Sequence, residues 1–261
     1  MMIIDNESAD IPTPSGPMRV CVSRPAAPGK YPGVVLFSEI FQITGPIRRT
    51  AAMLASHGMV VAVPEIFHEL ESPGCVLAYD QAGAERGNAD KVGKPVSAYD
   101  ADCKATFDFL TGHAACTGRL GAMGICIGGH LAFRAAMHPE CRAAACFYPT
   151  DIHKGSLGKG GDDSLSRVRE IAGELLLIFG RQDPHIPYDG RRAIMDALER
   201  AAVRYQWHEF NAQHAFIRDE GHRYDPALAS ITFQMVVEMF ARRLGEGDEM
   251  VPAADQGPDR C

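Results

Sequence analysis

Residues 124–129 read Gly-Ile-Cys-Ile-Gly-Gly and place the thiol of Cys126 between two glycines. The apolar run before Gly124 predicts a buried strand, and the alanine-rich run 127–137 predicts a helix that stops before a proline. A sharp strand-to-helix turn needs glycines two residues before and after its centre, because a Cβ there would strike the backbone. The helix start favours a thiolate through its free N–H groups. The stretch therefore predicts a nucleophile elbow, with a buried structural cysteine as the alternative.

Two further candidates follow predicted strands in the order acid, then histidine. The apolar run 174–180 is followed by Asp183 in a loop, and the alternating run 204–210 is followed by His214. Taken alone, Asp183 is compatible with a plain turn and His214 with an ordinary loop histidine. Nucleophile, acid and histidine in this chain order are typical of a catalytic triad carried by one edge of a parallel sheet.

Strand-like and helical runs alternate along the chain, which predicts an α/β fold with a mostly parallel sheet and helices on both faces. The predicted strands are 18–23, 33–37, 59–63, 119–123, 143–147, 175–179 and 205–210. The predicted helices are 47–56, 98–111, the segment after Cys126, 190–201 and 226–244. We expect residues 65–96 to form an excursion over the site. One domain is predicted over 1–244, followed by a polar, disordered tail over 245–261.

Composition excludes several classes of protein. An apolar content of 46% in 261 residues is enough for one core covered on both faces. A net charge of −7 without a basic patch excludes nucleic acid as a partner. No apolar run approaches the roughly 18 residues of a membrane span, and no signal peptide is recognisable, so we expect no membrane partner and a cytoplasmic location. The 8 cysteines contain no CxxC pair, and the 10 histidines lack HxH or HExxH spacing, which predicts neither a disulfide scaffold nor a metal site.

The sequence resembles the dienelactone hydrolase family of α/β-hydrolases over most of its length. The resemblance rests on residues 124–129, on Asp183 and His214 in their loops, and on Ser-Glu-Ile-Phe at 38–41 after the strand 33–37. It implies an α/β-hydrolase fold and a cysteine hydrolase that needs no cofactor. In the family a glutamate at the position of Glu39 lies against the resting thiol and is displaced when substrate binds. A surface carboxylate at a strand end is the alternative for Glu39.

The resemblance also implies how a substrate is held. The backbone N–H groups of Ile40 and Ile127 would form the oxyanion hole. The family's arginine after the catalytic histidine falls on Arg218, and a second arginine corresponds to Arg86, so that the pair would bind a substrate carboxylate. A solvated surface side chain is the alternative for Arg218. Tyr148 is expected either to line the same pocket or to stand at its rim.

The expected function is hydrolysis of a small-molecule ester or lactone through a Cys126–His214–Asp183 triad. By resemblance, the substrate is dienelactone (carboxymethylenebutenolide) and the product is maleylacetate. A general carboxylesterase or thioesterase is the first alternative. The second is a non-catalytic relative that binds a small ligand, in which the triad residues would lie too far apart to react. The sequence leaves the exact substrate and the oligomeric state open.

Overall fold

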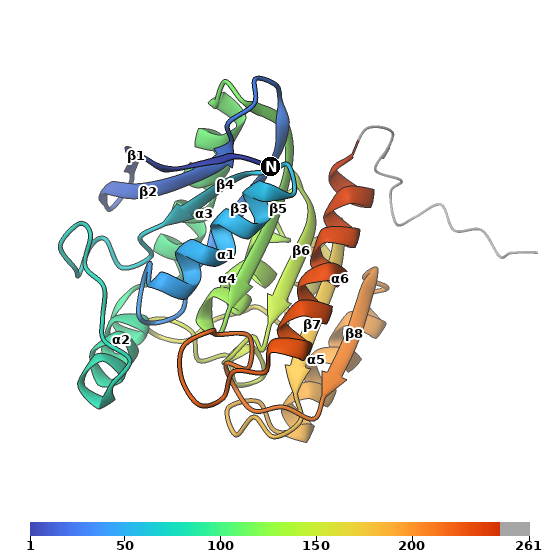
Figure 1. Cartoon of the computed structure of the whole chain (residues 1–261). Coiled ribbons are helices and arrows are strands. Elements are labelled where there is room, and N and C mark those ends of the chain that lie inside the picture. The colour runs from blue at the N-terminus through green and yellow to red at the C-terminus, as the bar shows by residue number, and fades with distance from the viewer. Residues whose placement is uncertain (246–261) are drawn as a thin grey trace, which may run out of the picture.

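The structure is a computed structural model and describes residues 1–245. Eight strands form one sheet in the order β1-β2-β4-β3-β5-β6-β7-β8 (Figure 1). Their bounds are β1 (Ile3–Thr13), β2 (Gly16–Pro25), β3 (Tyr31–Phe37), β4 (Val60–Pro64), β5 (Cys116–Ile125), β6 (Cys141–Phe147), β7 (Glu174–Gly180) and β8 (Tyr205–Phe210). The strands from β4 to β8 in this order are parallel, whereas β1 and β2 form an antiparallel hairpin at one edge.

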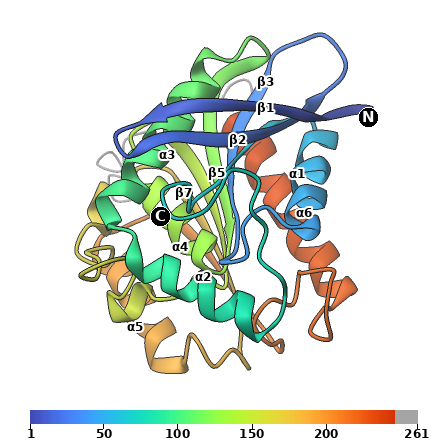
Figure 2. The same cartoon turned by 90° about the vertical axis from the view of Figure 1, so that its left-hand side faces the viewer.

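Helices cover both faces of the sheet. They are α1 (Gly45–Ser56), α2 (Gln81–Gly93), α3 (Val96–Gly112), α4 (Ile127–Ala135), α5 (Tyr188–Arg200) and α6 (Pro226–Leu244), with short 3-10 turns η1 (Ile152–Lys154) and η2 (Val168–Glu170). Helices α1 and α6 lie on one face and α3, α4 and α5 on the other (Figures 1 and 2). Because both faces are covered, the central strands are apolar without alternation, as in the wholly buried β4 and β7.

Four loops meet at the carboxyl edge of the parallel strands. Glu39 follows β3, Cys126 follows β5, Asp183 follows β7 and His214 follows β8. The register places Phe37 opposite Gly124 and Gly180 opposite Phe210, so neighbouring strands deliver these residues to the same level. This edge is where open parallel sheets place their ligand sites.

The expected excursion over residues 65–96 contains the helix α2. Its N-cap is Asp80, whose side chain accepts a hydrogen bond from the N–H of Gly83. The helix packs closely on the chain after β3: a Cβ added at Gly87 would lie only 2.4 Å from the carbonyl oxygen of Ile40, so this position requires a glycine. The predicted tail, apart from Gly245, lies outside the described residues.

Candidate active site

Cys126 stands on a strained turn between β5 and α4. Its φ is 63° and its ψ is −120°, a conformation that raises a side chain above the turn. A Cβ at Gly124 would lie 1.8 Å from the carbonyl oxygen of Gly128, and one at Gly128 would lie 2.3 Å from that of Phe37. Both glycines are therefore required by close backbone approaches, as the sequence predicted.

His214 lies beside this thiol, and Asp183 holds the far side of its ring. His214 Nδ1 donates to Asp183 Oδ2 over 2.6 Å, and both residues are buried. The second oxygen of the carboxylate, Oδ1, accepts the N–H of His185 at 2.8 Å. Burial disfavours the imidazolium, but the interactions of the ring with Cys126 and with the Asp183 carboxylate outweigh this cost and raise the pKa of His214 to about 10. The arrangement therefore favours a protonated His214.

Glu39 is 3% exposed and accepts a hydrogen bond at Oε2 from the hydroxyl of Tyr79, over 3.0 Å. Burial raises the pKa of Glu39, and the charge of Arg218 and the bond from Tyr79 only partly offset this effect. The Tyr79 hydroxyl also lies 2.7 Å from Thr44 Oγ1. Glu39 is therefore a buried carboxyl held by the neighbouring loop and not a surface carboxylate.

Ile40 and Ile127 have the backbone donors expected of an oxyanion hole. Ile127 is the first residue of α4, so its N–H has no acceptor within the helix. Within residues 1–245 neither N–H donates to another backbone group. Cys126 and Ile40 both line the main cavity, and Ile127 directly follows Cys126 in the chain.

One cavity of about 640 Å³ contains the nucleophile, the histidine and the glutamate. It is lined by Glu39, Ile40, Phe41, Tyr79, Asp80, Ala84, Asn88, Lys91, Cys126, Thr150, Asp151, Lys154, His185, His214, Ala215, Arg218, Glu220, Gly221, His222 and Arg223. Asp183 stands behind His214 and does not reach the cavity wall. The cavity is therefore bounded by the loops after β3, β5, β6, β7 and β8 and by α2 with the loop before it.

Arg218 and Arg86 differ in position. The Arg218 guanidinium lines the cavity, lies 4.1 Å from the ring centroid of Tyr79, and donates through Nε to the Glu220 carbonyl over 3.0 Å. Its Nη1 lies 3.9 Å from Glu39 Oε1. Arg86 is 60% exposed, is not a cavity residue, and binds the Glu71 carboxylate through two bonds of 2.5 Å. The structure does not bring Arg86 to the site, because its exposed side chain is paired with Glu71 outside the cavity.

Tyr148 does not line the cavity either. Its ring is fully buried and packs edge-on against His214, with 4.8 Å between centroids. Its backbone φ of 34° lies in the left-handed region, and burial raises the pKa of its hydroxyl. The side chain supports the imidazole from behind and holds no position from which to touch a substrate in the cavity.

These features agree with a known family. The model of the "Dienelactone hydrolase family" matches residues 18–244. The chain belongs to the dienelactone hydrolase family. A Saccharomyces cerevisiae protein named "Putative carboxymethylenebutenolidase" is 41% identical, over 93% of this chain and 93% of its own length. The carboxymethylenebutenolidase of Pseudomonas sp. strain P51 is 25% identical, over 83% of this chain and 87% of its own.

A solved structure supports the fold of this dienelactone hydrolase family member. The crystal structure described as "Putative Dienelactone Hydrolase from Klebsiella pneumoniae subsp. pneumoniae MGH 78578" superposes with a TM-score of 0.82 at 24% identity. The match covers 93% of this chain and 100% of that chain. The family and the α/β-hydrolase fold predicted from the sequence are thus confirmed.

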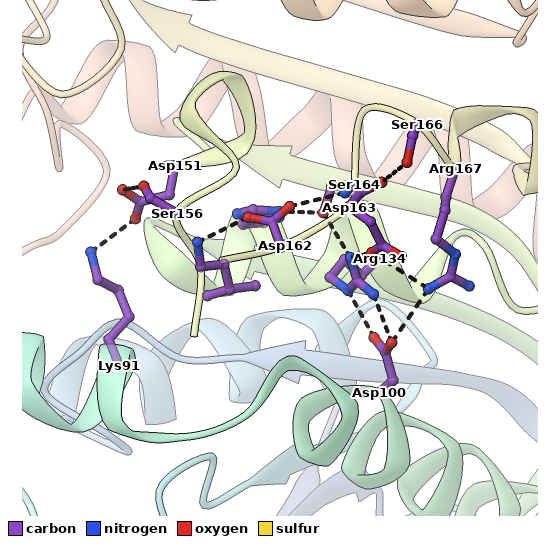
Figure 3. Close-up of polar contacts among 12 residues, drawn as sticks. Lys91, Asp100, Arg134, Asp151, Ser156, Asp162, Asp163, Ser164, Ser166 and Arg167 are labelled. Carbon is purple, nitrogen blue, oxygen red and sulfur yellow. Dashed lines mark hydrogen bonds and ion pairs between the residues drawn. The ribbon is translucent and has the colours of Figure 1, made fainter. Parts of the chain in front are cut away.

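Nothing in the sequence indicated that Tyr79 and Lys91 belong to the cavity of this family member. Tyr79 binds Glu39 from the loop before α2, and Lys91 of α2 pairs with Asp151 over 2.9 Å. Figure 3 shows this pair beside a polar network that ties α4 to the loop after β6. In that network Arg134 of α4 binds Asp100, Asp163 and Ser164 at 2.7–2.9 Å. A tyrosine and a lysine in a polar segment carry no motif, so pattern alone offered no signal.

One group within residues 1–245 has the geometry of a metal site, formed by His68, Glu69 and Asp102. It lies outside the cavity. The Lys94 ammonium binds Glu69 at 2.7 Å and also binds Asp102, so a protein cation already takes the central position. Among the described helices none is both long and apolar enough to cross a membrane.

Proposed function

We propose that this protein is a carboxylic ester hydrolase that opens anionic lactones of the dienelactone type through a Cys126–His214–Asp183 triad. The observation that carries the proposal is the elbow thiol beside a histidine held at 2.6 Å by a buried aspartate, in one cavity with Arg218. The relatives named carboxymethylenebutenolidase support the same substrate class. The compact triad argues against a non-catalytic ligand-binding relative.

The first half of the reaction is acyl transfer to sulfur. The Cys126 thiolate attacks the lactone carbonyl carbon, and the N–H groups of Ile40 and Ile127 stabilise the resulting oxyanion. Collapse of the tetrahedral intermediate breaks the ring C–O bond. The leaving enolate takes a proton from the His214 imidazolium, whose charge Asp183 stabilises. The product of this half-reaction is a thioester on Cys126 with neutral His214.

The second half releases the acid. Water attacks the thioester carbonyl while His214 accepts its proton, and the C–S bond breaks to return the thiolate and the imidazolium. For dienelactone the released diacid is maleylacetate. No step needs a cofactor, because the thiol, the imidazole and water supply all the atoms.

Glu39 and Arg218 make this reaction depend on the charge of the substrate. Glu39 is a buried carboxyl whose pKa is raised by burial, and its contact with Arg218 is long, at 3.9 Å. Glu39 and Cys126 line the same cavity. We propose that a substrate carboxylate binds Arg218 and draws Glu39 aside, so that the thiolate forms mainly in the complex. Charge-assisted bonds from a guanidinium contribute about 1.5–3 kcal/mol each, which is enough to drive such an exchange.

A general carboxylesterase or thioesterase with the same triad is the second candidate. The cavity volume of about 640 Å³ favours it, since pockets of this size accept drug-sized ligands and a dienelactone is much smaller. A panel of cis- and trans-dienelactone, neutral aryl esters and acyl thioesters separates the two. A large kcat/KM advantage for the charged lactones, abolished in Cys126→Ala, supports the proposal. Equal turnover of neutral esters assigns the enzyme to the broader class.

We also propose a cytoplasmic location. The seven cysteines within the described residues are all free thiols, which suits a reducing compartment. Cell fractionation with an antibody against the protein tests this: recovery with secreted or periplasmic proteins contradicts it.

A further inference from the structure

We propose that Arg49 of α1 determines the preference for anionic substrates by keeping the carboxylate of Glu220 away from Arg218. The inference rests on the proposed function, in which Arg218 binds a substrate carboxylate. It adds a positioning residue outside the cavity and a competing carboxylate inside it. The observations that carry it are the contacts of the loop after His214.

This loop places two acids directly after the substrate-binding arginine. Arg218 is followed by Asp219 and Glu220, and its Nε donates to the Glu220 backbone carbonyl over 3.0 Å. Glu220 lines the same cavity as Arg218. Asp219 is not among the residues of that cavity and lines a separate one of about 260 Å³. Of the two acids, Glu220 is therefore the one that shares a cavity with Arg218.

Arg49 binds both acids. Its Nε lies 2.5 Å from Asp219 Oδ2, and its Nη2 lies 2.8 Å from both Asp219 Oδ1 and Glu220 Oε1. The pairs raise the pKa of the Arg49 guanidinium, first through the bond to Asp219. Each ion pair is about half exposed and therefore weak by itself, but the planar fork sets the direction of both carboxylates.

Gly45 leaves room for this arrangement. A Cβ at Gly45 would lie 3.0 Å from Arg49 Nη1 and 3.1 Å from Glu220 Oε1, so a side chain there would crowd the pair. Gly45, the first residue of α1, thus has no side chain at the point where Arg49 and Glu220 meet. The ion pair and the glycine independently locate the Glu220 carboxylate against α1.

With Glu220 held by Arg49, the guanidinium of Arg218 is available to bind a substrate carboxylate. Its Nη1 is 3.9 Å from Glu39, beyond hydrogen-bond distance, and its plane rests near the Tyr79 ring. Without Arg49, the Glu220 carboxylate is free to turn and pair with Arg218. It would then compete with the substrate carboxylate for the same donors, and only charged substrates would bind more weakly.

The test uses four variants of the full-length enzyme: Arg49→Leu, Glu220→Gln, the double variant, and Arg48→Leu as the matched control. Arg48 is the exposed neighbour on α1, and its replacement removes the same charge without touching the loop. The measurement is KM and kcat for one carboxylate-bearing lactone and one neutral aryl ester. Circular dichroism and a thermal melt of each variant check that the fold is retained.

We expect Arg49→Leu to raise KM for the charged lactone about three- to tenfold, with KM for the neutral ester and both kcat values unchanged. Glu220→Gln in the same chain should restore the KM, because it removes the competing charge without restoring any contact of Arg49. Arg48→Leu should match the native enzyme. A merely structural role for Arg49 predicts no such rescue.

Two results overturn the inference alone: native KM in Arg49→Leu, or a raised KM that Glu220→Gln fails to restore. An equal rise in Arg48→Leu also overturns it, since general electrostatics would then explain the effect. If the native enzyme shows no Cys126-dependent turnover, or no preference for the charged lactone, the proposed function itself is contradicted. The kinetics of the native enzyme and of Cys126→Ala are therefore measured before any Arg49 variant is compared.

Discussion

Replacing Asp183 by asparagine removes one charge at the buried end of the triad and keeps the size of the side chain. In the native enzyme its two oxygens bind His214 Nδ1 at 2.6 Å and the N–H of His185 at 2.8 Å. The N–H of His185 needs an acceptor, so the asparagine oxygen faces it and the NH₂ group turns to His214. Nδ1 must then accept, Nε2 carries the hydrogen, and the ring no longer takes the proton of the thiol.

The size of the effect follows from these contacts. A buried charge-assisted hydrogen bond contributes about 1.5–3 kcal/mol, and the wrong tautomer adds to this loss. We expect kcat/KM to fall about 10³- to 10⁴-fold, or about 4–5.5 kcal/mol in the barrier. Because the carboxylate helps raise the pKa of His214 to about 10, the pKa of the imidazole should also fall in Asp183→Asn.

The assay is steady-state hydrolysis of the charged lactone at pH 7, with an NMR titration of the histidine rings. Asp189→Asn is the control, since Asp189 is an exposed acid in the first turn of α5. It should retain native kcat/KM. A loss below tenfold in Asp183→Asn, or an equal loss in both variants, would refute the reasoning that Asp183 orients the catalytic base.

Three further predictions concern the pocket and the turn. Arg218→Gln should raise KM for the charged lactone about 10- to 100-fold and leave that for neutral esters unchanged; steady-state kinetics decide this, and equal losses on both substrates contradict it. Glu39→Gln should lower turnover yet raise Tm at pH 7 and not near pH 4, because burial raises the pKa of Glu39 in the folded state: its ionisation costs no stability below the ordinary carboxyl pKa and costs progressively more as the pH rises from there through the raised pKa. A thermal melt at both pH values checks the sign; an equal gain at both would be inconsistent with it. Gly128→Ala should lower Tm by at least about 5 °C, since its Cβ would meet the Phe37 carbonyl; an unchanged melting curve is the contrary result.

Periodicity was a reliable guide to the core of the fold. The seven predicted strands correspond to β2 through β8, because buried parallel strands are apolar along their whole length. The first strand, β1, was not predicted: it begins Ile-Ile-Asp-Asn-Glu-Ser-Ala-Asp, and all of its residues except Ile11 are exposed or half-buried at the sheet edge. Helix α2 was also missed as a helix, since it buries only Gly83 and Gly87 and has no apolar stripe.

Some residues of the site could likewise be predicted from the sequence, and others could not. The triad could be predicted because strand ends and glycine requirements are local properties, and the structure brings Cys126, His214 and Asp183 together. The positions of Arg86 and Tyr148 depend on contacts that no local pattern reveals. The bond from Arg86 to Glu71 and the packing of Tyr148 behind His214 become visible only when the elements are assembled.

The central claim is that Cys126 carries the acyl group of a lactone, and a rapid-quench experiment tests it most directly. Native enzyme is mixed with the charged lactone, quenched in acid within the first turnover, digested and analysed by mass spectrometry. The account predicts a peptide containing Cys126 whose mass is increased by one whole lactone, because ring opening keeps all atoms on the thioester. Turnover without any adduct on Cys126, or an adduct confined to another residue, would contradict it.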